Sequence, residues 1–200
     1  MTRIVAGSRR GRRIAAPPGR DTRPTSDRVR EALFSALDAR VDLVGCRFLD
    51  LYAGSGAVGL EAASRGAASV RLVESDPRAA RTVRANIDML DLGAVCRLST
   101  AHVGAMLGQP PPETYDVVFA DPPYAIGEDE VAGMLTALVA GAWLAEDALV
   151  VIERSTRSAE PTWPDGMSVE GGRRYGETTL WFARSVIRSP RGEREQEGVQ

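Results

Sequence analysis

From about residue 47 onward, strand-like apolar runs alternate with helix-like segments, and this alternation constrains the fold more than any other feature. We predict strands at 48–52, 70–74, 95–98, 117–120 and 148–153, and helices starting near residues 57, 77 and 128. Repeated strand–helix units of this length are typical of a mostly parallel sheet with helices on both faces. The chain is therefore predicted to have an α/β, Rossmann-like fold.

Both ends of the chain depart from this alternation. Segments 3–6 and 13–16 flank a tip rich in Gly and Arg, which predicts a small N-terminal β-hairpin, and Thr25 or Ser26 is suited to cap the helix that follows. Two strand-like stretches, 167–172 and 178–184, have no helix between them and predict a hairpin at the sheet edge, which gives seven strands. We expect a basic arm at 1–24, a main domain at 25–184 and a disordered tail at 185–200.

The composition predicts a cytoplasmic protein with an ordinary apolar core. The chain has 200 residues, of which 44% are hydrophobic, so it needs neither disulfides nor a structural metal. Its two cysteines, Cys46 and Cys96, lie in apolar stretches and are predicted to be reduced core residues. We find no apolar N-terminal leader, no run of membrane-spanning length and no His/Cys cluster with metal-binding spacing.

Charge is distributed unevenly along the chain. Residues 1–30 carry nine Arg and two Asp, a net charge of +7, although the whole chain has a net charge of −2. A basic end on an acidic body is expected when that end meets a nucleic acid or another polyanion. The candidate residues for contacting a nucleic acid are Arg9, Arg10, Arg12, Arg13 and Arg23. A solvated basic hairpin is the alternative interpretation.

A glycine-rich loop follows the first predicted strand of the main domain. Gly54, Gly56 and Gly59 fit the G-x-G-x-x-G pattern, which also occurs in NAD-binding folds, and Glu74 ends the next strand, where it could hold a ribose diol. Asp50 distinguishes the two cofactors, because a carboxylate there suits the cationic groups of S-adenosylmethionine better than a pyrophosphate. The predicted cofactor-binding residues are Asp50, Tyr52, Ala53, Gly54, Ser55, Gly56, Glu74 and Asp121.

The tetrapeptide Asp121-Pro122-Pro123-Tyr124 follows the fourth predicted strand of the main domain. Two prolines fix the backbone and remove two N–H donors, which leaves a stiff turn with carbonyl oxygens, a carboxylate and an aromatic ring. Such a turn suits an exocyclic NH₂ group on a planar base. The alternative is an ordinary turn that ends the strand. We predict these four residues to be the catalytic ones, with no metal involved.

With these motifs assembled, the chain resembles the class I S-adenosylmethionine-dependent methyltransferases. It is most similar to the bacterial family that methylates N2 of guanine 966 in 16S ribosomal RNA. The segments that carry the resemblance are 3–7, 11–12, 23–34, 49–56, 121–124 and 175–178. The resemblance implies the class I methyltransferase fold, S-adenosylmethionine as cofactor, and 16S ribosomal RNA as partner within a small subunit or an assembly intermediate, with no obligate protein partner.

One segment departs from the wider class pattern. Many class I enzymes have an acidic residue after strand three that holds the cofactor's adenine, whereas residues 98–102 contain no carboxylate. We therefore assign no side chain to the adenine, and we expect His102 to start a helix. Arg23 and Thr25 could lie near the methionine end of the cofactor.

The predicted reaction is transfer of a methyl group to an extruded base. The Asp121 carboxylate and the Pro122 carbonyl would accept hydrogen bonds from the amine, while Tyr124 stacks on the base. Three alternatives remain open from the sequence: an adenine-N6 methyltransferase, a non-catalytic RNA-binding or assembly factor, and an NAD-dependent enzyme.

Overall fold

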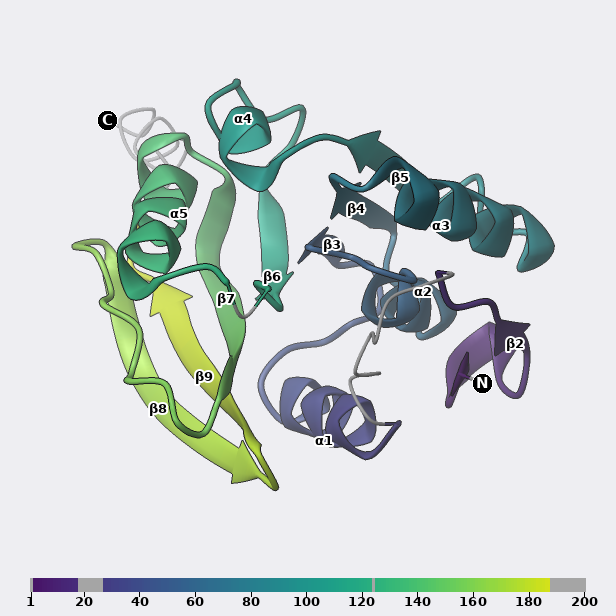
Figure 1. Ribbon diagram of the computed structural model, residues 1–200, viewed down its shortest axis with the longest axis horizontal. Coiled ribbons are helices and arrows are strands. Elements are labelled where there is room, and N and C mark those ends of the chain that lie inside the picture. The colour runs from purple at the N-terminus through teal and green to yellow at the C-terminus, as the bar shows by residue number, and fades with distance from the viewer. Residues whose placement is uncertain (1, 18–26, 124, 188–200) are drawn as a thin grey trace, which may run out of the picture.

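The centre of the protein is a seven-stranded sheet with the strand order β5-β4-β3-β6-β7-β9-β8 (Figure 1). It is seen in a computed structural model that describes residues 2–17, 27–123 and 125–187. The five parallel strands are β3 (Arg47–Leu51), β4 (Ser69–Glu74), β5 (Cys96–Thr100), β6 (Tyr115–Ala120) and β7 (Leu144–Ser155). The antiparallel strands are β8 (Met167–Tyr175) and β9 (Thr178–Ser185), and β9 lies between β7 and β8. The predicted mostly parallel seven-stranded sheet is confirmed.

Helices cover both faces of this sheet because its strands alternate two sets of apolar side chains. One set, which includes Phe48, packs with α1 (Asp27–Asp38), α2 (Ala57–Ser64) and α3 (Pro77–Met89). The other set, which includes Leu49, packs with α4 (Val103–Leu107) and α5 (Glu128–Ala140). The two cores fix the positions of the strands. The loops after β3, β4 and β6 therefore meet at the carboxyl end of the sheet.

The N-terminal hairpin is docked on the body of the protein. Its strands β1 (Thr2–Arg3) and β2 (Arg13–Ile14) are joined through a 3₁₀ turn, η1 (Gly7–Arg9). Ile4 and Ile14 are buried in the main core. Residues 2–17 of the predicted basic segment are therefore part of the folded unit, and their position is set by packing as well as by charge.

A buried carboxylate on α2 fixes the hairpin. Glu61 accepts hydrogen bonds from the backbone N–H groups of Val5 (2.7 Å) and Ala6 (2.9 Å), and it also pairs with Arg65. At Gly7 the backbone has φ +80°, and an added Cβ would lie 1.9 Å from the carbonyl oxygen of Ser64. Only glycine fits there, so the hairpin approaches α2 as closely as two backbones can.

Several element boundaries differ from the predictions for local physical reasons. The first strand of the main domain covers residues 47–51 and not 48–52, because Tyr52 adopts φ 64° and turns the chain into the glycine loop. β7 begins at Leu144, earlier than the predicted 148, with an irregular register where it first meets β6. The short α4 begins directly after His102, which occupies its N-cap position without a side-chain capping bond, so this residue starts a helix as expected.

The described helices are all too short or too polar to cross a bilayer.

Candidate active site

The loops at the carboxyl ends of β3, β4, β5 and β6 enclose a cleft of about 1100 Å³. It lies where ligands bind in open α/β sheets, beyond the strand ends. Tyr175 and Glu177, on the hairpin between β8 and β9, line one side, and Thr2 and Ala16 of the N-terminal hairpin line another. The predicted cofactor loop and the predicted catalytic turn therefore open on the same cleft.

The glycine loop after β3 turns sharply at positions where glycine is required. Gly54 and Gly56 have φ of 59° and 81°, in the left-handed region that glycine adopts without strain. The N–H of Ala53 donates to the carbonyl of Val73 (2.8 Å), which fastens the loop to the end of β4. At Gly59 an added Cβ would lie 3.1 Å from the Asp50 carboxylate, so this glycine lets α2 pack against β3.

Asp50 is a buried carboxylate beneath this loop. Its Oδ2 accepts a hydrogen bond from the N–H of Gly59 (2.8 Å), and the residue is 1% exposed. Burial raises the pKa of Asp50 to about 7, and the nearby charges of Asp121 and Glu74 push it in the same direction. A positive ligand in the cleft would favour the ionised form of this group.

Glu74 joins two loops at the end of β4. Its Oε2 accepts from the N–H of Gly54 and its Oε1 accepts from the N–H of Asp76, both at 2.8 Å. Each carboxylate oxygen has two lone pairs, so Glu74 can still accept hydrogen bonds from a diol in the cleft. The residue is thus both a brace for the glycine loop and a candidate ligand-binding group.

The predicted catalytic turn follows β6 directly. Asp121 is partly exposed, Pro122 is buried and Pro123 is exposed, and all three line the cleft. The carbonyl of Pro123 accepts a hydrogen bond from the N–H of Ile126 (2.9 Å), so the chain turns back at once. Tyr124 lies outside the described residues.

A buried arginine on β7 holds the segment that follows the turn. Arg154 donates from Nη2 to Glu128 Oε1 (2.6 Å) and to the carbonyl of Ile126 (3.4 Å). Because Glu128 opens α5, this ion pair ties the Pro-Pro turn to both β7 and α5. Nothing in the sequence pattern had indicated this contact.

Asn86 on α3 was also missed by the sequence analysis, although it connects two parts of the site. Its Nδ2 donates to the carbonyls of Ser55 (2.9 Å) and Ala15 (3.0 Å), and its Oδ1 accepts from the N–H of Ala15 (2.9 Å). The residue is 1% exposed. One amide therefore holds the glycine loop and the N-terminal hairpin together.

The candidate RNA-contacting arginines of the hairpin have different surroundings. Arg9 donates to the carbonyls of Leu90 and Asp91, and Arg12 donates to that of Met89 at 2.7 Å, so both cap the carboxyl end of α3. Arg10 and Arg13 are exposed. Arg23 and Thr25 lie outside the described residues.

Residues 101–104, which form the turn after β5 and the start of α4, also line the cleft. Cys46 and Cys96 are buried free thiols, as predicted. Within residues 2–17, 27–123 and 125–187, no group of three or more His, Cys, Asp or Glu side chains could hold a metal ion.

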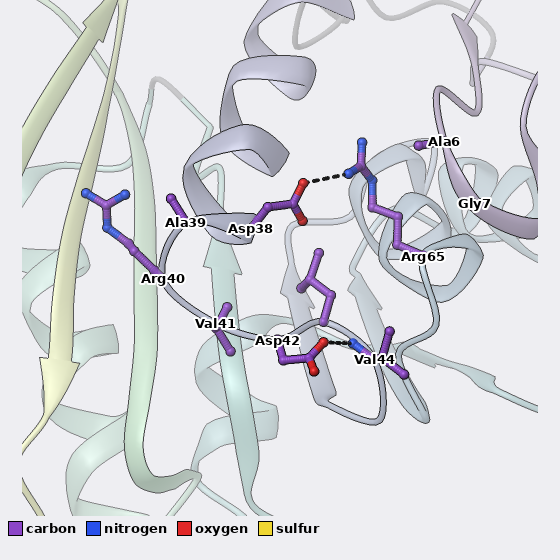
Figure 2. Close-up of a pocket in the computed structure, with 10 residues that line it drawn as sticks. Ala6, Gly7, Asp38, Ala39, Arg40, Val41, Asp42, Val44 and Arg65 are labelled. Atoms are coloured by element: carbon purple, nitrogen blue, oxygen red, sulfur yellow. Dashed lines mark hydrogen bonds and ion pairs between the residues drawn. The ribbon is translucent and has the colours of Figure 1, made fainter.

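Figure 2 shows a second hollow, of about 670 Å³, near the amino ends of the strands. Its charged groups already have partners: Arg65 pairs with Asp38 (3.1 Å), Arg40 pairs with Glu170 (2.9 Å), and Asp42 accepts from the N–H of Val44 (2.9 Å). It lies at the end of the sheet opposite the glycine loop and the Pro-Pro turn. We therefore place the active site in the larger cleft.

The chain is similar to known proteins over most of its length. The model of the family described as conserved hypothetical protein 95 matches residues 2–184. The chain is 36% identical to ribosomal RNA small subunit methyltransferase D of Escherichia coli K12, over 84% of this chain and 81% of that protein. It is 33% identical to the putative rRNA methyltransferase YlbH of Bacillus subtilis, over 88% and 95%. A solved structure, the putative methyltransferase yhhF from Escherichia coli, has a TM-score of 0.80 and 31% identity, and the match covers 93% of this chain and 98% of that one.

Proposed function

The chain belongs to the conserved hypothetical protein 95 family, and from that premise we propose that it is an S-adenosylmethionine-dependent rRNA methyltransferase. Its proposed target is the exocyclic N2 amine of a guanine in 16S ribosomal RNA, at a site of the G966 type, reached in the cytoplasm within a small subunit or an assembly intermediate. The names of its relatives support rRNA as the substrate class. The assignment of guanine N2 as the methylated group rests on the resemblance in segments 3–7, 11–12 and 23–34.

The observation that carries the proposal is the convergence of two loops on one cleft. The glycine loop with Glu74 lies at the ends of β3 and β4, and the Asp121-Pro122-Pro123 turn lies at the end of the adjacent strand β6. A methyl donor in the first part would lie beside an amine held in the second. Direct transfer of a group between two bound molecules requires that they lie close together in this way.

The residues at the β3 and β4 ends fit S-adenosylmethionine. Glu74 has carboxylate lone pairs available for a ribose diol, and the backbone at Gly54 and Gly56 lets a ligand approach closely. Asp50 and Asp121 place negative charge where the cationic methionine end would lie. When bound, this cofactor supplies an electrophilic methyl group on a sulfonium.

The Pro-Pro turn would prepare the amine for attack. The lone pair of the guanine N2 is delocalised into the ring, so the nitrogen is a poor nucleophile. The Asp121 carboxylate and the Pro122 carbonyl accept hydrogen bonds from its two N–H groups. These bonds favour a pyramidal nitrogen whose lone pair is directed at the methyl. Asp121 then takes the proton that the nitrogen loses on methylation.

The target base must leave its stack to enter the cleft. Tyr124 is proposed to stack on the extruded base, a contact worth about 1–3 kcal/mol. Arg9, Arg10, Arg12, Arg13 and Arg23 are proposed to contact RNA phosphates, which position a substrate without reading its sequence. Arg9 and Arg12 would do so while also capping α3.

A labelling experiment tests the proposal. The purified protein is given labelled S-adenosylmethionine with unmodified 16S RNA or with unmodified small subunits, and the methylated nucleotide is identified after digestion. We expect N2-methylguanine at a single site. N6-methyladenine would instead support the adenine-N6 alternative, and binding of RNA without any transfer would support a non-catalytic assembly factor. Failure to bind S-adenosylmethionine while binding NAD would support the oxidoreductase interpretation.

A further inference from the structure

The outer side of α3 carries three exposed arginines, Arg78, Arg81 and Arg84. Within the part of the chain that the structure describes, none of them forms a salt bridge. The chain beyond residue 30 is acidic overall, so a run of unpaired cations on one helix is exceptional within it. These arginines lie outside the basic N-terminal segment that the sequence analysis singled out.

The position of Arg78 opposes the helix dipole. It is the second residue of α3, whose first turn contains no acidic side chain. A helix N-terminus carries a partial positive charge, so a cation there lowers helix stability by about 0.3–1 kcal/mol. The Asp76 carboxylate caps this end of the helix by accepting from the N–H groups of Arg78 and Ala79 and offsets part of the cost. A residue that breaks a local rule in this way is expected at functional sites.

Arg78 and Arg81 line a groove beside the active-site cleft. This hollow, of about 440 Å³, has Arg78, Arg81 and Thr82 along α3, with the small side chains of Ala15 and Ala85 between and opposite them. We call it the α3 groove. One of its walls is the hairpin strand that Asn86 fixes to the helix.

The α3 groove leads directly into the cleft. Ala15 lines the groove and the next residue, Ala16, lines the cleft. In the same way Ser75 lines the cleft, and the chain continues through the cap residue Asp76 to Arg78 in the groove. A polymer whose one residue enters the cleft would pass its neighbouring residues along this groove.

We propose that the α3 groove binds the sugar-phosphate backbone of the RNA next to the methylated nucleotide. This inference rests on the proposed function and extends the RNA-binding surface from the hairpin onto α3. Two guanidinium groups match phosphate oxygens in charge and in hydrogen-bonding geometry, and small alanine side chains let a bulky backbone come close. Such contacts are independent of base sequence.

Charge neutralisation tests the groove directly. The double variant R78Q/R81Q is compared with wild type and with the control R97Q. Arg97 is an exposed arginine near the amino end of the edge strand β5, away from the cleft. We expect the Kd for unmodified 16S RNA to rise about tenfold for R78Q/R81Q. The slope of log Kd against log salt should fall by about 1.5, because two phosphate contacts are lost.

The variant should keep its fold and its cofactor. S-adenosylmethionine affinity should match wild type, and the melting temperature should be equal or slightly higher, because a cation leaves the first turn of α3. RNA affinity and salt slope equal to those of R97Q would overturn the inference. If the melting temperature and the cofactor affinity both fall, the arginines act on folding. That result would also overturn the inference.

Crosslinking distinguishes RNA from a ribosomal protein as the occupant. A photo-crosslinker is attached to Ala85→Cys, with the exposed α4 position Ala105→Cys as the matched control. The native thiols are buried, and burial raises the pKa of both Cys46 and Cys96 to about 12, so they should not be labelled. Crosslinks from position 85 to 16S RNA in small subunits support the groove. Crosslinks to a ribosomal protein, or equal RNA yields from both positions, contradict it.

Failure of the proposed function would look different. In that case wild type would transfer no methyl group to 16S RNA, whatever the effect of R78Q/R81Q on binding. Failure of the groove inference would leave wild-type transfer intact and the variant indistinguishable from R97Q. The two results are read from separate measurements, transfer and binding.

Discussion

The two walls of the cleft carry opposite charge. One wall consists of the Pro-Pro turn and the start of α5, where Asp121, Glu128, Asp129 and Glu130 lie close together in sequence. The other is bordered by the hairpin and α3, which lie beside the cleft and carry the exposed Arg10 and Arg13 and the α3 groove. Both α3 and α5 have 13 residues, yet only α5 has the acidic first turn that suits a helix dipole.

This contrast separates chemistry from docking. A polyanion is attracted to the basic wall and repelled by the acidic one, so its backbone stays outside while a neutral base can approach the turn. Substitution of Asp121, the acid of the catalytic turn, should therefore change the rate of transfer at saturating RNA. Substitutions on the basic wall should change RNA affinity and its salt dependence. Each prediction below tests this division, beginning with the largest expected effect.

Asp121→Ala should lower methyl transfer at saturating RNA by at least about 100-fold, because the amine loses a charged acceptor in the transition state. RNA affinity should be unchanged. Single-turnover transfer of labelled methyl measures the rate, and Asp129→Ala, an exposed acid on α5, is the matched control. Turnover near that of wild type would remove Asp121 from the chemistry.

Glu74→Ala should weaken S-adenosylmethionine binding about 10- to 100-fold, since hydrogen bonds to a charged group contribute about 1.5–3 kcal/mol. The N–H groups of Gly54 and Asp76 also lose their acceptor, so the glycine loop becomes less well fixed. Titration calorimetry gives the affinity, with the exposed Glu146→Ala as control. An unchanged affinity would contradict the cofactor site.

Cofactor affinity should depend on pH through Asp50. Its pKa of about 7 means that at pH 6 the group is mostly protonated and must lose a proton when a cationic ligand binds. Affinity should rise up to about tenfold from pH 6 to pH 8, about half of that fold-change being reached by pH 7, and level off above pH 8. Calorimetry in buffers of different ionisation enthalpy would detect the released proton. Asp50→Asn should flatten the profile, and a profile that stays steep would assign it to another group.

The substitutions R10Q/R13Q should have the smallest effect, a rise in RNA Kd of about three- to tenfold with a shallower salt slope. These side chains are exposed, so the fold should be preserved. Deletion of residues 1–20 would be a poor substitute, because it would also remove the buried Ile4 and Ile14. Filter binding at several salt concentrations measures the effect. A fall in transfer at saturating RNA would break the division between the walls.

The parts of the molecule that could be predicted are those whose cause is local in sequence. The glycine loop and the Pro-Pro turn each follow an apolar strand directly, so their residues and the end of the sheet at which they meet are set by short segments. The terminal hairpin was predictable for the same reason. Its two strands are adjacent in sequence and lack an intervening helix.

Contacts between distant segments could not be predicted. Glu61 holds the hairpin from 55 and 56 residues away, and Asn86 reaches Ala15 across 71 residues. A buried Glu or Asn in a helix gives no periodic signal of its partner. The sequence therefore indicated a basic hairpin but not its packing against α2 and α3. The arginines of α3 were missed because they are spread among residues of other types.

The side-chain amide of Asn86 couples the position of the hairpin to that of the glycine loop. If the hairpin lifts away from α3, the Asn86 side chain loses two of its three hydrogen bonds, and a buried polar group left unpaired costs about 1–3 kcal/mol. The remaining bond, to the carbonyl of Ser55, is then held by a side chain that is free to change rotamer. Opening of the hairpin would thus loosen the glycine loop at the cleft, and a ligand that closes either element stabilises the other.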